Sequence, residues 1–184
     1  LTFAQQFGAK AGMNVSTISD EGFDDTKSKV GYYAGVFMNV PVSESFSIQP
    51  EVLYNNLGSK VSSTVSGTTY SSTLNLDYVA VPVMFQYKAT PQFYLEAGPE
   101  FGFLVNAKQK FDNGSSSIVT ELDKEDFNSF NMGVGLGLGF DISKNVGLNA
   151  RYVAGFSDIT KESGPAADAK NKNNAFQVGL NIKF

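Results

Sequence analysis

The sequence of 184 residues contains no cysteine and no histidine. Without cysteine there is no disulfide bond, no thiolate nucleophile and no cysteine-ligated metal. Without histidine, zinc sites, Ser–His catalytic pairs and imidazole acid–base catalysis all lose their usual partner. We therefore expect a protein that is not an enzyme and that holds no cofactor and no metal.

Charge and long apolar runs are also scarce. Charged residues make up 17% of the chain, against about 25% in a soluble globular domain, and the formal net charge of −4 provides no basic field for nucleic acid. Apolar residues reach 42% but never form the run of about 18 that a membrane-spanning helix needs. Even the densest stretch, Tyr78–Phe85, contains Pro82. These features exclude a helical membrane protein, and the length fits one domain.

Apolar and polar residues instead alternate along most of the chain, with the period of two that is typical of β-strands. In the clearest case, Phe130–Ile142, large apolar residues alternate with glycine, asparagine and aspartate. The pattern predicts eight strands, at Phe7–Val15, Val30–Val40, Phe46–Asn55, Thr73–Tyr87, Phe93–Val105, Phe130–Ile142, Val146–Ser157 and Phe176–Phe184. The fourth is ambiguous because both of its faces are apolar from Val79 to Phe85, which either a bulge or an apolar plug at one end of the interior would explain.

The connections between these strands alternate in length. Short turns follow the second, fourth and sixth strands, at Pro41–Ser45, Lys88–Gln92 and Ser143–Asn145. Long polar connections follow the other strands, at Thr17–Lys29, Gly58–Ser72, Ala107–Asn128 and Asp158–Asn173. Strands of about 10–12 residues, tilted by about 40°, span an apolar band of about 25 Å. The predicted fold class is all-β: an eight-stranded antiparallel up-and-down transmembrane β-barrel with four long extracellular loops and short periplasmic turns, and with both termini periplasmic.

The alternation alone does not say which face points outward. A soluble, lipocalin-like calyx would place the apolar face inside, around a ligand. Two observations favour the inverse arrangement. Glycines at positions 133, 135, 137 and 139 would make room for neighbouring side chains inside a narrow barrel. On an outer surface in contact with water they would have no such role. An eight-stranded barrel is also too narrow to enclose most of the phenylalanine, leucine and tyrosine of this chain. We expect lipid on the apolar face and polar side chains in the lumen.

Several segments resemble a known family. Gln49-Pro50-Glu51-Val52-Leu53-Tyr54, Tyr78-Val79-Ala80-Val81-Pro82-Val83 and Tyr94-Leu95-Glu96-Ala97-Gly98-Pro99 resemble the outer-membrane β-barrel domain family common in Bacteroidota, labelled "porin family" or PorT-like, with an OmpA/OmpX-type eight-stranded barrel. The chain end with Phe184 looks like the strand that the barrel-assembly machinery recognises. The resemblance implies the outer membrane of a Gram-negative cell but no particular activity.

The sequence predicts a short N-terminal segment followed by one domain. Residues 1–5 resemble the tail of a secretory signal or form a disordered N-terminus. Residues 6–184 are then a single outer-membrane β-barrel domain.

The charged residues on the polar face are the strongest candidates for a functional site. They are Lys10, Glu51, Glu96, Glu100, Asp141 and Arg151. Unpaired charges in a confined interior are costly, so these should pair with one another. One interpretation is a gate or ion path whose salt bridges exchange partners. The other is a structural plug that fills the barrel.

Two acidic clusters in the long connections, Asp20–Asp25 and Glu121–Asp126, have the oxygen ligands that calcium prefers but no EF-hand spacing. Solvated loop charge explains them more simply. The leading hypothesis is a non-enzymatic barrel that anchors in the membrane, binds a partner through its extracellular loops or serves as an accessory subunit of a larger complex. A narrow channel and the soluble calyx are the alternatives. The expected partners are outer-membrane lipid, lipopolysaccharide, the assembly machinery and other outer-membrane proteins.

Overall fold

The computed structural model describes residues 5–19, 27–122, 129–158 and 172–184. No helix in these ranges is long and apolar enough to cross a membrane. The strands are β1 (Gln6–Ser19), β2 (Lys27–Pro41), β3 (Phe46–Val65), β4 (Thr68–Lys88), β5 (Phe93–Asp112), β6 (Ser117–Glu121), β7 (Phe130–Asp141), β8 (Val146–Asp158) and β9 (Lys172–Lys183).

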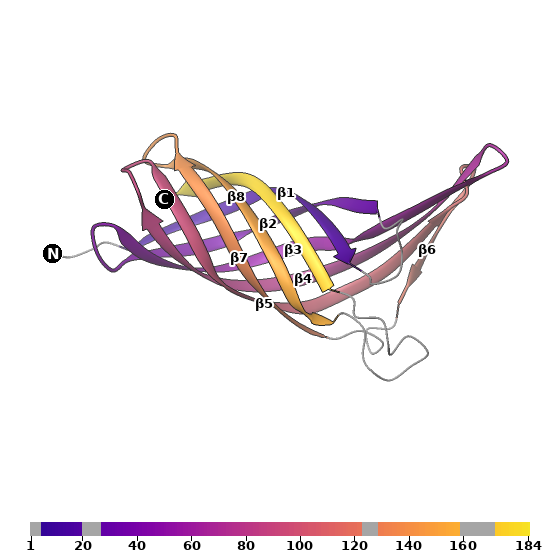
Figure 1. Ribbon diagram of the computed structural model, residues 1–184, viewed down its shortest axis with the longest axis horizontal. Coiled ribbons are helices and arrows are strands. Elements are labelled where there is room, and N and C mark those ends of the chain that lie inside the picture. The colour runs from indigo at the N-terminus through magenta and orange to yellow at the C-terminus, as the bar shows by residue number, and fades with distance from the viewer. Residues whose placement is uncertain (1–4, 20–26, 123–128, 159–171) are drawn as a thin grey trace.

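Eight of these strands close into a ring, as predicted (Figure 1). The order around the ring is β1-β2-β3-β4-β5-β7-β8-β9, and β1 pairs with β9 to seal it. All of these pairings are antiparallel. They join strands that are consecutive in the chain, except at this seam and between β5 and β7, which pair directly although β6 lies between them in sequence. β6 pairs with the far part of β5. We call the end with the turns after β2, β4 and β7 the short-turn end, and the opposite end the long-connection end.

The wall of the barrel is apolar outside and polar inside. The exposed side chains include Phe7, Leu136 and Phe176, which are 58%, 59% and 48% exposed. The most deeply buried large side chains include Arg151 and Gln177, which are each 1% exposed. This polarity is the inverse of a soluble protein and of a lipocalin-like calyx, so the prediction that the apolar face points outward and the polar face into the lumen is confirmed.

Glycines on the inner face create space for large side chains. A Cβ added at Gly139 on β7 would overlap the ring of Tyr94 on β5, and one added at Gly179 on β9 would overlap the hydroxyl of Tyr33 on β2. These glycines of β7 and β9 therefore leave room in the narrow lumen for the tyrosine side chains of β5 and β2.

Both features that the sequence suggested for the fourth strand are present, next to the ambiguous stretch Val79–Phe85 and not within it. β4 pairs Asp77 with Asn106 and Tyr78 with Leu104, so Val105 is an extra residue and forms a bulge on β5. The inward face of β4 also contributes to an apolar cluster at the long-connection end. The cluster, which we call the apolar plug, consists of Leu57, Leu76, Tyr78, Leu104, Ala107 and Ala175.

Two of the predicted long loops are largely strand. β3 and β4 remain paired to Val65 and Thr68, around a turn at Ser66 and Gly67 with positive φ angles of 50° and 82°. β5 continues to Asp112 and pairs with β6. Together the far parts of β3, β4 and β5 with β6 form a sheet, here called the extension, that projects beyond the ring in Figure 1. Alternation could not reveal the extension because most of its residues on both faces are solvent-exposed.

Candidate functional site

The centre of the lumen holds a cluster of four charged side chains, each with 0% side-chain exposure. Lys10 Nζ donates to Glu51 Oε1 at 2.8 Å. Arg151 donates from Nη1 and Nη2 to the two oxygens of Glu51 at 2.9 and 2.8 Å, and from Nε to Glu96 Oε1 at 2.8 Å. We call these four residues the central cluster.

The barrel brings the central cluster together from four strands, since Lys10 lies on β1, Glu51 on β3, Glu96 on β5 and Arg151 on β8. Gly137 of β7 pairs with Glu96 on one side and with Arg151 on the other. A Cβ at Gly137 would lie 3.0 Å from Glu96 Oε1, so the glycine lets these two side chains meet across the strand between them. Glu51 reaches Arg151 from the opposite wall, which ties the two walls of the barrel together.

Amide side chains extend the central cluster toward the short-turn end. Gln49 Nε2 donates to Glu51 at 2.8 Å, and Gln86 Nε2 donates to Glu96 at 3.0 Å. Asn39 Nδ2 donates to both Gln49 and Gln86, at 3.1 and 2.8 Å. The sequence-based selection of charged residues missed this layer. The signal that could have found it was the run of buried-face amides on the second, third and fourth strands.

Asp141 does not join the central cluster. It lies at the short-turn end, where Lys183 Nζ donates to Asp141 Oδ2 at 2.7 Å, and Lys183 is a partner that sequence reasoning did not single out. Phe184 follows, with its side chain 76% exposed and its backbone N–H donating to the carbonyl of Phe7 at 2.8 Å. The Lys183–Asp141 contact links β9 to β7 across the intervening β8, and the Phe184–Phe7 contact links the end of the last strand to β1 at the seam.

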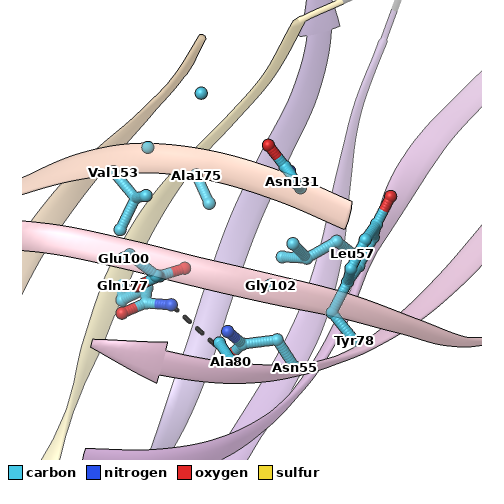
Figure 2. Close-up of a pocket in the computed structure, with 12 residues that line it drawn as sticks. Asn55, Leu57, Tyr78, Ala80, Glu100, Gly102, Asn131, Val153, Ala175 and Gln177 are labelled. Atoms are coloured by element: carbon cyan, nitrogen blue, oxygen red, sulfur yellow. Dashed lines mark hydrogen bonds between the residues drawn. The ribbon is translucent and has the colours of Figure 1, made fainter. Parts of the chain in front are cut away.

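Glu100 lies on the other side of the central cluster, beside a small cavity of about 20 Å³ (Figure 2). Its Oε2 atom is buried and has no hydrogen-bond partner among the described residues. Asn55, Tyr78 and Asn131 also line the cavity and each carries a buried polar atom in the same condition. Glu100 is thus placed near the other predicted lumen charges but is not bonded to them.

The interior is closed at several levels. Tyr33 and Asn149 are hydrogen-bonded across the lumen at 3.1 Å, and Asn181 donates to the hydroxyl of Tyr94 at 3.0 Å. The apolar plug follows at the long-connection end. This filled, internally bonded interior fits a structural plug better than a conducting path.

In the described part of the chain, no group of three or more Asp or Glu side chains is arranged to hold a metal ion. The acidic cluster at Asp20–Asp25 and residues 123–126 of the second acidic cluster lie outside the described residues.

The extension offers a second candidate surface. Its lumen-side face is lined by Val61, Tyr70, Phe111 and Ile118 around a groove of about 340 Å³. These side chains are 47%, 49%, 48% and 66% exposed. All five residues of β6 are exposed. A projecting sheet with an exposed apolar face is a common feature of protein-binding surfaces.

The model of a family described as outer membrane protein beta-barrel domain matches residues 3–161 of the chain. No curated protein matches the sequence.

Among solved structures, the chain is similar to Ail, the attachment invasion locus protein of Yersinia pestis, with 13% identity, 100% of both chains covered and a TM-score of 0.56. A second Ail structure, in complex with the heparin analogue sucrose octasulfate, is 14% identical over 98% of this chain and 99% of that one, also with a TM-score of 0.56. Neisserial surface protein A is 12% identical over 97% of each chain, with a TM-score of 0.54. At such low sequence identities, the similarity to these structures shows a shared fold and nothing more.

Proposed function

Because the chain belongs to the outer membrane protein beta-barrel domain family, and is therefore an outer-membrane barrel, we propose that it acts without catalysis, as a membrane anchor that presents its extension and long connections to a partner. In this proposal the long-connection end faces the cell exterior and both termini face the periplasm. The apolar wall contacts lipid, and the polar extension lies beyond the bilayer, next to lipopolysaccharide.

The observation that carries the proposal is the sealed interior. The central cluster joins opposite walls through Lys10, Arg151, Glu51 and Glu96 at distances of 2.7 to 2.9 Å. A path for ions through this level would require these buried pairs to separate, and an uncompensated buried charge is costly. An eight-stranded barrel has room inside for side chains and little else. The proposal therefore ranks anchoring and partner binding above conduction.

The extension supports the partner-binding half of the proposal. It exposes an apolar groove although water surrounds both of its faces, and its edge strand β6 contains Ile118 and Val119, which are 66% and 57% exposed. Exposed edges of this kind accept further strands or partner surfaces. A barrel that served only to stabilise the envelope would have no need for such a sheet.

The experiment compares the wild-type barrel with a shortened variant. Val61 pairs with Ser72 and Lys60 with Thr73, so replacing residues 61–72 by Asn-Gly closes the hairpin with a two-residue turn and leaves the ring intact. We expect both proteins to show no steady single-channel conductance in planar bilayers. We also expect a partner, identified by mass spectrometry after capture in mild detergent, to be lost from the shortened variant. Steady conductance of the wild type, or equal capture by both proteins, would contradict the proposal.

The proposal also includes two more specific statements about the origin and the assembly of the barrel. They are a Bacteroidota origin with PorT-like relatives, and recognition of the strand that ends in Phe184 by the barrel-assembly machinery. The second is supported by the exposed aromatic ring of Phe184 at the seam. Removing Phe184 should lower the amount of barrel in the outer membrane of cells while leaving refolding into vesicles unchanged. Equal cellular levels of both proteins would argue against it.

A further inference from the structure

Glu100 differs from the other acidic side chains near the centre of the lumen. Glu51 and Glu96 each accept hydrogen bonds from Arg151 and from a glutamine side chain. Glu100 is 9% exposed, and its Oε2 atom is buried with no hydrogen-bond partner among the described residues. A charged carboxylate that is removed from water without a partner is strongly disfavoured. The folded barrel must therefore avoid this charge.

The two cations that act electrostatically on Glu100 are Arg151 and Lys10, and both are bound to other carboxylates. Arg151 donates to both oxygens of Glu51 and to Glu96. Lys10 donates to Glu51. All four side chains of this central cluster have 0% side-chain exposure. The central cluster thus contains two positive and two negative charges, and it is balanced without Glu100.

Lysines at the two ends of the lumen are also bonded to other groups. The Lys29 ammonium group donates to Asn56 near the long-connection end. The Lys183 ammonium group is paired with Asp141 at the short-turn end. Within the ranges that the structure describes, the lumen therefore offers Glu100 no spare cation.

The side chains packed around Glu100 carry no charge (Figure 2). The small cavity beside it is lined from strands on every side of the lumen, by Asn55 of β3, Tyr78 of β4, Asn131 of β7 and Gln177 of β9 among others. In this lining, Tyr78 and Glu100 are the titratable residues. The charged groups that face Glu100 are accordingly those of the central cluster, whose charges already cancel.

We propose that Glu100 is an uncharged carboxylic acid in the folded barrel, and that loss of its proton is a switch that weakens the ring. The uncharged form leaves two cations and two carboxylates at the centre of the lumen, so no further ion is needed. The ionised form would add a buried negative charge beside a cluster that has no free cation to receive it. This inference concerns the ring and does not depend on the partner that the extension binds.

The dependence of stability on pH tests the proposal. In the unfolded chain Glu100 is in water, where a glutamate side chain ionises at about pH 4.3. A folded barrel that keeps this proton at higher pH binds one proton more than the unfolded chain, so its stability falls as the pH rises. We expect the ratio of the unfolding constants of the wild type and Glu100→Gln to rise by up to about tenfold per pH unit above about pH 5. The rise should end where Glu100 ionises in the folded barrel.

Urea unfolding in detergent, followed by circular dichroism, supplies these constants. Glu100→Gln has nearly the shape of the protonated side chain and no titrating group, so it should fold and lack this part of the pH dependence. Glu44→Gln is the matched control, because Glu44 is exposed in the first short turn, and it should retain the profile of the wild type. Identical pH profiles of the wild type and Glu100→Gln would overturn the proposal.

Infrared spectroscopy detects the proton without unfolding the barrel. The C=O stretch of a protonated carboxyl group is separate from the bands of carboxylates. We expect this band in the folded wild type at about pH 6, where exposed carboxyl groups are ionised, and we expect it to disappear as the pH is raised. Glu44→Gln should keep the band and Glu100→Gln should lack it. A folded wild type without the band at this pH would overturn the proposal. Neither measurement involves a partner or a conductance, so the inference and the proposed function can fail separately.

Discussion

The strands β3, β4 and β5 run through both the ring and the extension, and the surroundings of their side chains differ between these two regions. In the ring, their residues alternate between lipid and a lumen packed with bonded polar groups. In the extension, both faces of the same strands are largely exposed, and the groove residues Val61, Tyr70 and Phe111 are about half exposed. Ion pairs differ in the same way, since Lys10–Glu51 in the ring has 0% side-chain exposure and Lys108–Glu121 in the extension has 38% and 78%.

This difference shows that the stability of the barrel resides in the ring. Buried pairs and lipid-facing side chains have no alternative partner, whereas exposed groups exchange their contacts for water at little cost. Changes in the ring should therefore be expensive and changes in the extension nearly neutral. Four substitutions test this contrast.

The largest effect is expected for Arg151→Met. Loss of the guanidinium leaves the carboxylates of Glu51 and Glu96 buried without their main cationic partner, which typically costs about 3–5 kcal/mol. Urea unfolding in detergent or vesicles measures the change. Lys108→Met, which breaks the corresponding pair in the extension, is the matched control and should cost at most about 1 kcal/mol. Similar losses in the two variants would remove the distinction between the regions.

Leu136→Arg tests the outer wall. Leu136 is 59% exposed on β7, and an arginine facing the middle of the bilayer costs about 2–4 kcal/mol. Folding yield and unfolding free energy in lipid vesicles are the readouts. Ser116→Arg, in the exposed turn before β6, should change neither. A barrel that tolerated both substitutions equally would not have its apolar wall in lipid.

Gly139→Ala tests the inner wall. The added methyl group overlaps the ring of Tyr94, and overpacking of this kind costs about 1–3 kcal/mol. Combining it with Tyr94→Leu should restore part of the loss, because residues in contact are coupled. A double-mutant cycle of unfolding free energies measures this coupling. Strict additivity of the two changes would mean that the glycine does not serve to accommodate the tyrosine.

The smallest effect is expected for Ile118→Thr on β6. This side chain is 66% exposed, and substitutions at exposed positions usually change stability by no more than about 0.5 kcal/mol. Thermal unfolding should be nearly superimposable on that of the wild type. A clear loss of stability would show that β6 packs against another part of the barrel.

The alternation of residues was enough to predict the ring, because a membrane wall separates lipid from lumen at every position. The bulge at Val105 and the apolar plug appeared in the sequence only as ambiguity in the fourth strand, since alternation is lost where both faces are apolar. The extension escaped prediction for the opposite reason, because a sheet that is exposed on both faces carries no alternation.

The candidate site was predicted in part. Charged residues at similar heights on the polar face indicated that Glu51, Glu96 and Arg151 would lie near one another. Their individual bonds depend on register and on the diameter of the ring, which no local pattern encodes. The pairing of Asp141 with Lys183 and the unbonded state of Glu100 follow from these long-range distances, so only the closed structure reveals them.

The seam between β1 and β9 has a consequence for biogenesis. Gly8 is aligned with Lys183 and Ser19 with Lys172, so nearly the whole chain separates the two partners of this ladder. Such distant pairing is slow to form, and until it forms, the sheet carries two unsatisfied edges that invite association with other chains. The barrel consequently needs its first strand to be shielded from the time it is synthesised until the last one arrives.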